Sequence, residues 1–392
     1  LSQDGKRLYV TNSGHNEVAV INAATRKVIG DIPTGWYPTQ VLAHDGKLSI
    51  TSAKGLGAGP NNGPGHPNPT DPRDTAENQY SGSMIKGLLS TVSEPDAATL
   101  AKLTATVEKN NTANDPARSS AVPNQIGTTS SKIKHVIYIV RENRTFDQEL
   151  GSNGRGNADP SLNLFGEESA PNTRALARQF TTFDNFYADA EVSANGWNWV
   201  SQANSNPWSE EMWPSNYSGR GAPYPAESND PDSRAKEHDS YFWEHLSKNN
   251  ISFRNYGFYT TLDKKGKAHG VDKKILDPNT DHDFIGWSLD CPDSARSFAP
   301  MAKNCGPKSR VDEWKSDFNK QLAKGSVPTV QLVRFGNDHT QATKVGVPTP
   351  QAYVADNDQA IGQLVETVSH SPIWKDTAIF LTEDDAQNGP DQ

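Results

Sequence analysis

The sequence predicts an α/β protein in which a mostly parallel sheet is flanked by helices and preceded by a partial β-propeller. From residue 132 onward, runs of apolar and β-branched residues alternate with helical patterns, as in sheets built from strand–helix–strand units. Two of these runs, 134–141 and 377–382, stop abruptly at polar residues that include carboxylates. Residues 1–55 differ, because their short strand-like runs repeat with a period of about 40 residues, which is typical of propeller blades.

The repeat in residues 1–55 consists of two similar segments. Asp4–Asn12 recurs as Asp45–Ser52, and two further strand-like runs, 17–21 and 27–32, lie between the copies. The residues Tyr9-Val10-Thr11-Asn12 resemble the YVTN family of β-propeller repeats. A closed propeller takes about four to eight blades, whereas only about one blade and part of another are present here. We therefore expect a partial propeller in a chain that is truncated at both ends.

Residues 56–131 are predicted to connect two domains. The stretch from 56 to 94 is rich in Gly, Pro and Asn and is expected to be an irregular loop, with one strand near 85–92. A helix is predicted over 95–107, because Leu100, Leu103 and Val107 share one face. The polar run 110–131 is interpreted as a linker. The predicted boundaries are therefore 1–55, 56–131 and 132–392.

The third region, 132–392, carries the α/β pattern. A long loop is expected over 204–236, of the kind that often carries specificity. The other predicted elements, in chain order, are a strand at 135–140, a helix at 175–180, a helix at 241–249, a strand at 251–256, a helix carrying Trp314, Phe318 and Leu322, a strand at 327–333, a helix at 361–368 and a strand at 377–382.

The composition argues against two classes of protein. The formal net charge of −9 argues against a general nucleic-acid-binding protein, which would usually be basic. No window approaches the roughly 20 consecutive apolar residues that cross a bilayer. We therefore expect no nucleic-acid partner and no transmembrane segment, and the composition leaves the oligomeric state open.

The residues at the start and the two cysteines bear on cellular location. Leu1–Lys6 form neither a signal peptide nor a natural start, so the absence of a targeting signal is uninformative. We expect an exported protein, periplasmic or extracellular, whose signal peptide is not present in this chain. Cys291 and Cys305 are the two cysteines in the sequence. We expect them to form a disulfide closing a loop of about 15 residues, which contributes roughly 3 kcal/mol in the chain-entropy model. Two free buried thiols are the alternative.

Polar clusters follow three of the predicted strands. The clusters are Glu142 with Asn143, Asn337 with Asp338 and His339, and Asp384 with Asp385. Because parallel strands bring their carboxyl ends to one edge of the sheet, we expect these side chains to converge. Carboxylate and carboxamide oxygens suit a hard divalent cation. Such a cation can activate a hydroxyl group, and Ser193, at a predicted turn, is the candidate.

The strand-end motifs resemble a known family. The run His135–Asp147 is similar to the opening motif of the bacterial phosphoesterase family that includes phospholipase C and acid phosphatases of the AcpA type. Glu191–Ala194, Asn337–Thr340 and Thr382–Gln387 resemble its later motifs, so the resemblance covers about 134–392. It implies an alkaline-phosphatase-like fold and hydrolysis of phosphate esters, and a YVTN-type blade is a known partner of this domain.

The resemblance also implies roles for individual residues. It implies a metal cage made by Glu142, Asn143, Ser193, Asp384 and Asp385. Ser193 would be the nucleophile that forms a phosphoserine intermediate, and His339 would bind phosphate or transfer protons. As further substrate-binding candidates we name Asn337, Asp338 and His282, the last of which lies between two aspartates.

Several alternatives stay open from the sequence. The metal could be Ca²⁺, Mg²⁺, Zn²⁺ or Fe, and the substrate a phosphomonoester or a phosphodiester, including a phospholipid head group. A different class of function is a surface-binding propeller protein with an inactive phosphoesterase domain. Trp197 motivates this alternative, because the family pattern leads us to expect a histidine there. A third alternative is a related sulfatase-like or phosphomutase-like enzyme, and the absence of the Cys/Ser-x-Pro-x-Arg sulfatase pattern around Ser193 argues against a sulfatase.

Overall fold

The computed structural model describes residues 1–57, 85–111, 132–227, 241–294, 305 and 308–386. The chain divides into two compact units, the first made of Leu1–Asn68 and Arg73–Thr128 and the second of Pro69–Pro72 and Thr129–Gln392. Most of the expected loop at 56–94 and of the expected linker at 110–131 lies outside the described residues. No helix among the described residues is long and apolar enough to span a membrane.

The first unit is built from two antiparallel sheets and one helix. One sheet has the order β1-β2-β3 and the other the order β4-β5-β6. The elements are β1 Arg7–Asn12, β2 Glu17–Asn22, β3 Lys27–Pro33, β4 Trp36–His44, β5 Lys47–Gly55, β6 Leu88–Ser93 and α2 Ala97–Asn111. Leu100 of α2 is buried with Val20, Ile32 and Leu48 of the strands. The described strands of this unit do not form a closed propeller.

Strand β4 was missed by the sequence analysis. Pro38 lies inside it, and the pairing of β4 with β5 shifts register on both sides of this residue. Proline cannot donate a backbone hydrogen bond and is confined to edges and irregular positions of sheets. The proline thus removed the regular strand signal, although the chain on either side still pairs with β5.

The second unit is organised around a parallel sheet. Within the described residues its strands are β7 His135–Arg141, β8 Phe253–Tyr256, β11 Val330–Arg334 and β12 Thr377–Glu383, in the order β12-β7-β11-β8. All neighbouring pairs are parallel, and Ile137 of β7 is level with Gln331 of β11 and Ile379 of β12. The predicted mostly parallel sheet is confirmed, with β7 in its interior.

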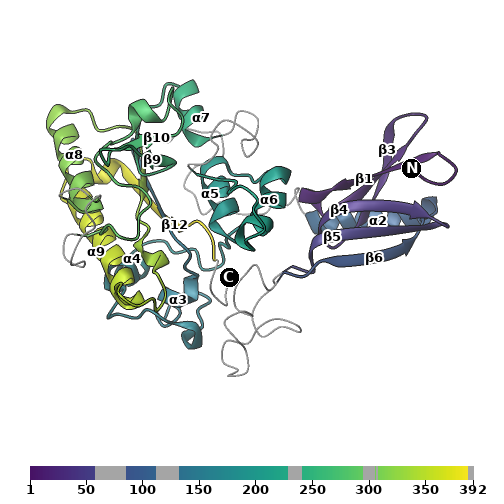
Figure 1. Ribbon diagram of the computed structural model, residues 1–392, viewed down its shortest axis with the longest axis horizontal. Coiled ribbons are helices and arrows are strands. Elements are labelled where there is room, and N and C mark those ends of the chain that lie inside the picture. The colour runs from purple at the N-terminus through teal and green to yellow at the C-terminus, as the bar shows by residue number, and fades with distance from the viewer. Residues whose placement is uncertain (58–84, 112–131, 228–240, 295–304, 306–307, 387–392) are drawn as a thin grey trace. The chain divides into compact units, whose positions relative to one another are not determined.

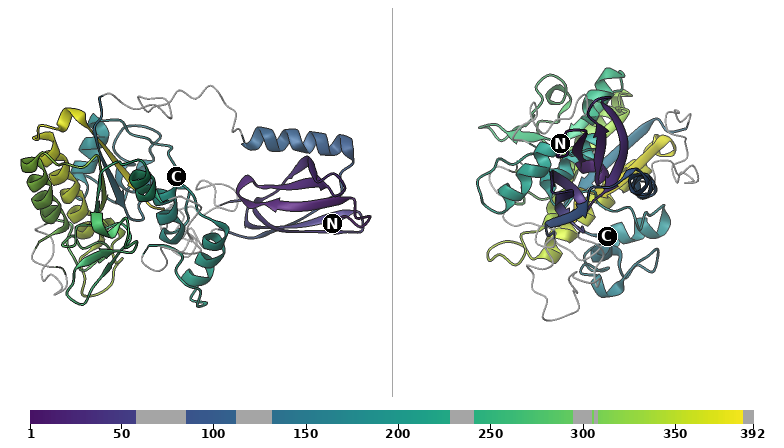
Figure 2. Two further views of the ribbon diagram at one scale, coloured as in Figure 1. Left: turned by 90° about the horizontal axis from the view of Figure 1, so that it is seen from above. Right: turned by 90° about the vertical axis from the view of Figure 1, so that its right-hand side faces the viewer.

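Helices cover both faces of this sheet (Figures 1 and 2). On one face, α8 Arg310–Lys324 and α9 Pro350–Ser369 pack their apolar sides against β7 and β11, and α4 Pro171–Gln179 packs beside α9. On the other face, α5 Ser193–Gln202 and α7 Phe242–Lys248 contribute Trp197 and Trp243 to a second core. Burial on both faces explains why β7 reads as a continuous apolar run.

The predicted loop at 204–236 is wrong in part, because α6 Pro207–Tyr217 lies within it, while 228–236 lie outside the described residues. Asn206 caps this helix by accepting a hydrogen bond from the Ser209 N–H, and Pro207 occupies the first turn. Both are standard signals for a helix start. The remaining short elements are α3 Phe146–Leu150, β9 Thr260–Leu262 and β10 Ala268–Gly270, with several 3₁₀ turns that include η4 Asp277–Asn279 and η5 Asn337–His339.

The expected disulfide is confirmed. Cys291 and Cys305 are bonded, with their Cα atoms 5.2 Å apart. The bond lies in the segment that precedes α8, and Cys291 is buried beside Ile285.

Candidate active site

The ends of β7 and β12 meet at the carboxyl edge of the sheet. Glu383 is level with Arg141 in the parallel register, so the residues that follow each strand lie next to one another. The Asp384 N–H donates to the Arg141 carbonyl at 3.1 Å, and the Asn143 N–H donates to Asp384 Oδ1 at 3.2 Å. The structure thus brings Glu142, Asn143, Asp384 and Asp385 together, although they come from segments about 240 residues apart in sequence.

Ser193 joins this cluster from the first turn of α5. Its hydroxyl oxygen lies 2.8 Å from Asp385 Oδ2, 3.0 Å from Asn143 Oδ1 and 3.5 Å from Glu142 Oε2. A hydroxyl has one proton to donate, and all three neighbours are acceptors. The Ser193 oxygen therefore lies among more acceptor oxygens than its own proton can satisfy.

A glycine allows α5 to approach β12 this closely. A Cβ atom built on Gly196 would lie 2.3 Å from the Asp384 carbonyl oxygen. No ordinary side chain fits this gap, because the obstructing atom is backbone. Gly196 is three residues after Ser193, so it determines how near the serine comes to the carboxylates.

The cluster is buried and rich in negative charge. Glu142, Asp384 and Asp385 have at most 2% of their surface exposed. Burial, and then the charges of Asp385 and Glu142, raise the pKa of Asp384 well above its usual range. Among the described residues, no hydrogen-bond partner reaches the buried Asp384 Oδ2. A buried carboxylate oxygen without a partner is costly, so a ligand of positive charge is indicated.

The donor set fits a hard divalent cation. Glu142, Asp384 and Asp385 offer carboxylate oxygens, Asn143 a carboxamide oxygen and Ser193 a hydroxyl, which are the ligands that such ions prefer. Among the described residues, however, these three carboxylates do not each place an oxygen within 4.8 Å of the other two. One carboxylate oxygen of Glu142 points instead to an arginine.

That arginine, Arg334, was missed by the sequence analysis. It is the last residue of β11, and its Nε donates to Glu142 Oε1 at 2.9 Å. Its guanidinium lies 4.2 Å from the ring centre of Trp197 and 4.8 Å from that of Trp287, and it also pairs with Glu227. Burial alone would lower the pKa of Arg334, but the charges of Glu142 and Glu227 outweigh it and raise the pKa. The sequence signal that could have identified Arg334 is its position at the end of a predicted strand, and the structure places this strand beside β7.

Trp197 also contacts the cluster. Its indole N–H donates to Glu142 Oε1 at 3.1 Å, and its ring is fully buried against Phe258. The tryptophan thus supports both Glu142 and the guanidinium of Arg334. Trp197 therefore forms part of the wall of the cluster.

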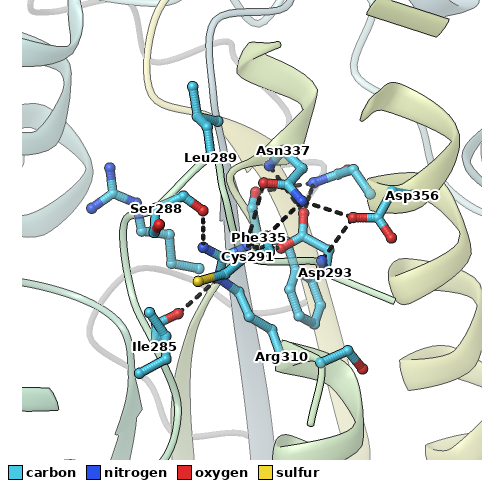
Figure 3. A network of polar contacts seen from close by, with 12 residues as sticks. Ile285, Ser288, Leu289, Cys291, Asp293, Arg310, Phe335, Asn337 and Asp356 are labelled. Atoms are coloured by element: carbon cyan, nitrogen blue, oxygen red, sulfur yellow. Dashed lines mark hydrogen bonds and ion pairs between the residues drawn. The ribbon is translucent and has the colours of Figure 1, made fainter. Parts of the chain in front are cut away.

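Asp338 and Asn337 lie behind the cluster. Asp338 accepts the Glu142 N–H at 3.1 Å and pairs with Arg141 at 3.2 Å, so it braces the backbone of a candidate ligand. Asn337 belongs to a buried network that connects β11 with the disulfide segment (Figure 3). Its amide nitrogen donates to the Cys291 carbonyl at 2.9 Å and to Asp356 at 2.7 Å.

The two candidate histidines lie in different surroundings. The His339 and Trp287 rings pack in a T-shaped arrangement with centroids 5.0 Å apart, and His339 Nδ1 lies 2.7 Å from the Thr340 carbonyl. Trp287 therefore contacts both His339 and Arg334. His282 lies beside His269 and Asp277, in a group of side chains distinct from the strand-end cluster. The structure does not bring His282 together with Ser193.

The chain belongs to the phosphoesterase family, whose model matches residues 155–389. A solved protein of the alkaline phosphatase superfamily from Vibrio parahaemolyticus is 17% identical, with a TM-score of 0.39. The match covers 66% of this chain and 56% of that protein, so the chain spans little more than half of its length. No curated protein matches the sequence.

Proposed function

We propose that the second unit hydrolyses phosphate esters with Ser193 as nucleophile and a divalent metal held by Glu142, Asn143, Asp384 and Asp385. One observation carries this proposal: the Ser193 hydroxyl lies within 3.5 Å of three oxygen atoms from two strand ends. The partnerless Asp384 Oδ2 and membership of the phosphoesterase family support it.

The residues of this chain can perform the following steps. Ser193 is positioned to pass its proton to Asp385 Oδ2, 2.8 Å away, as its oxygen attacks phosphorus. The ester oxygen leaves on the opposite side and takes a proton from solvent, and a phosphoserine forms at Ser193. Water then attacks the phosphoserine in line and loses a proton to solvent, and the Ser193 oxygen leaves phosphorus and regains its proton from Asp385. The two displacements retain configuration at phosphorus. A divalent cation, when bound, supplies positive charge that stabilises the serine oxygen and the phosphoryl oxygens.

Arg334 has a supporting role in this scheme. Its charge pairs with Glu142 and is buried between two indole rings. It therefore provides a counter-charge for one candidate ligand, Glu142, and fixes its orientation. We infer a positioning role for Arg334, and a phosphate-binding or proton-transfer role for His339 once a substrate is present.

The substrates that we propose are small phosphomonoesters or phosphodiesters, including phospholipid head groups. We further propose that the protein is exported, to the periplasm or the extracellular space. The Cys291–Cys305 disulfide supports this location, because disulfides persist mainly in oxidising compartments. We also propose that the first unit contributes blades to a YVTN-type propeller, supported by its antiparallel strands.

Hydrolysis of p-nitrophenyl phosphate and bis-p-nitrophenyl phosphate, with and without chelator, tests the proposal. We expect chelator-sensitive turnover that Ser193→Ala lowers at least a thousandfold, while part of the metal binding remains. Ser247→Ala, at an exposed serine of α7, is the control and should keep full activity. Full activity in Ser193→Ala would reassign the nucleophile. Absence of chelator-sensitive turnover would instead favour a binding protein with an inactive phosphoesterase domain.

Elemental analysis of the purified protein identifies the metal. We expect about one hard divalent ion per chain to be lost in Asp384→Asn, because this substitution removes a charged ligand. Unchanged metal content in that variant would contradict the proposed cage.

A further inference from the structure

A second group of side chains with metal-binding chemistry lies away from the strand-end cluster. His269 of β10, Asp277 of η4 and His282 each offer one ligand atom, and these atoms all lie within 4.8 Å of one another. We propose that these three residues bind a divalent transition-metal ion of the zinc class, at a site separate from the strand-end cluster. The two imidazole nitrogens determine the class of metal ion, since imidazole suits zinc, copper and nickel better than calcium or magnesium.

The distances within the group match the spacing of metal ligands. His269 Nδ1 lies 3.3 Å from Asp277 Oδ1, and His282 Nε2 lies 3.5 Å from the same oxygen. Charge-assisted N–H···O bonds are shorter, about 2.7–2.9 Å. Ligand atoms at the corners of a tetrahedral zinc site, each about 2.0–2.1 Å from the metal, are about 3.3 Å apart. The observed spacing therefore fits two edges of such a tetrahedron.

The backbone holds the three segments in this arrangement. The Gly270 N–H donates to Asp277 Oδ1 at 2.7 Å, and the Ala268 N–H donates to the His282 carbonyl at 2.9 Å. A Cβ atom on Gly270 would lie 2.7 Å from the Asp277 nitrogen, so the close approach needs glycine. The ligand set is thus fixed by main-chain contacts, which lowers the entropy cost of binding an ion.

The second nitrogen of His269 also has a partner. Its Nε2 lies 3.6 Å from Asp263 Oδ2. Histidines that bind metals generally direct their other ring nitrogen to a carboxylate, which fixes the tautomer. Asp263 lies beside Nε2 of His269, while Nδ1 of the same ring faces Asp277.

The site is open to solvent on one side. The side chains of His269 and His282 are 30% and 45% exposed. Asp277 and His282 also line a hollow of about 410 Å³, whose other lining residues include the acidic Asp281, Asp283 and Glu313 and the basic Arg254 and Lys320. The hollow leaves room for a further ligand beside the two side chains. Three protein ligands and an open fourth position describe a site that can take a water or an added ligand.

Cu²⁺ binding distinguishes the two sites spectroscopically, because the strand-end cluster offers oxygen ligands whereas this site offers two imidazole nitrogens. Metal-free protein is titrated with Cu²⁺ and followed by electron paramagnetic resonance. We expect hyperfine coupling to two nitrogens in the native protein. It should persist in Asp384→Asn, which separates this site from the proposed active site, and in the control His245→Ala, at an exposed histidine of α7.

The decisive variant is His269→Ala/His282→Ala. It should lose the nitrogen coupling and bind one equivalent of Zn²⁺ fewer than the native protein by equilibrium dialysis. If circular dichroism shows that the double variant does not fold, His282→Gln replaces it and should halve the coupling and lower Zn²⁺ affinity at least tenfold. Native protein without nitrogen coupling, or variants that bind Zn²⁺ as the native protein does, would overturn the proposal.

Discussion

At the scale of single residues, Glu142 combines several interactions in one buried carboxylate. One oxygen accepts hydrogen bonds from Arg334 and Trp197, and the other lies 3.5 Å from the Ser193 hydroxyl. Its backbone N–H is held by Asp338. The orientation of this candidate ligand therefore depends on partners from β11, α5 and η5.

Replacing Arg334 tests this dependence. In metal-free protein, Arg334→Met leaves Glu142 buried without its counter-charge, so we expect a loss of about 3–5 kcal/mol in the free energy of unfolding. Urea denaturation measures it. Arg178→Met is the control, because Arg178 and Glu167 form an ion pair whose side chains are 42% and 55% exposed. Such an exposed pair contributes about 0–1 kcal/mol, and similar losses in the two variants would contradict the assigned role.

At the scale of elements, the site depends on how closely α5 approaches the end of β12. Gly196→Ala places a methyl group against the Asp384 backbone, so α5 must shift and move Ser193 away from its acceptors. We expect turnover to fall at least a hundredfold, since small displacements of reacting groups are costly. Stability should fall by about 1–3 kcal/mol.

Gly14→Ala is the control for this substitution. A Cβ atom there meets nothing within 4 Å, so activity and stability should be unchanged. Steady-state kinetics and urea denaturation provide the comparison. Native activity in Gly196→Ala would show that the position of α5 does not limit the reaction.

The start of α4 is fixed by Asp358 of α9. Asp358 accepts hydrogen bonds from the Asn172 N–H at 2.9 Å and the Thr173 N–H at 2.7 Å. Burial is the main cause of the raised pKa of Asp358, although these hydrogen bonds oppose it. The folded protein therefore holds this proton to a higher pH than the unfolded chain does.

This shift predicts a pH dependence of stability. As pH rises from about 4, Asp358 loses its proton in the unfolded chain before it does so in the folded protein. Its contribution to the free energy of unfolding therefore decreases with rising pH until the pH exceeds the pKa of Asp358 in the folded protein. The difference in unfolding free energy between native protein and Asp358→Asn should therefore shrink over this range. Urea denaturation at several pH values measures it, and a difference that grows with pH would contradict the assignment.

At the scale of the whole molecule, the disulfide secures the segment beside the site. The Cys291 carbonyl accepts hydrogen bonds from Arg310 and Asn337, each at 2.9 Å, so Cys291 is tied to α8 and to η5 after β11. Reduction should lower the stability of the second unit by roughly 3 kcal/mol, the loop-closure value for about 15 residues. Thermal unfolding with and without reductant measures this loss. In Cys291→Ser/Cys305→Ser, reductant should have no effect, and an equal effect there would contradict the explanation.

Parts of the fold and site could be predicted from sequence because their signals are local. The apolar runs at β7 and β12 predicted two strands, and Glu142, Asn143, Asp384 and Asp385 follow them directly. Arg334 could not be singled out, because an arginine at a strand end is also typical of a surface ion pair. The neighbours of His282 in space, His269 and Asp277, are brought to it by backbone contacts that no local pattern records.

The sequence alone determined the parallel sheet, the carboxylates at its edge and the cysteine pair, because periodicity and strand-end chemistry are written in consecutive residues. Only the tertiary structure decided the distances within the strand-end cluster and the neighbours that no local pattern indicates. It placed the Ser193 hydroxyl 2.8–3.5 Å from three acceptor oxygens, Arg334 beside Trp197 and Trp287, and His282 beside His269. The physical reason is that packing and strand register bring together residues far apart in the chain, and burial then determines which charges need a partner.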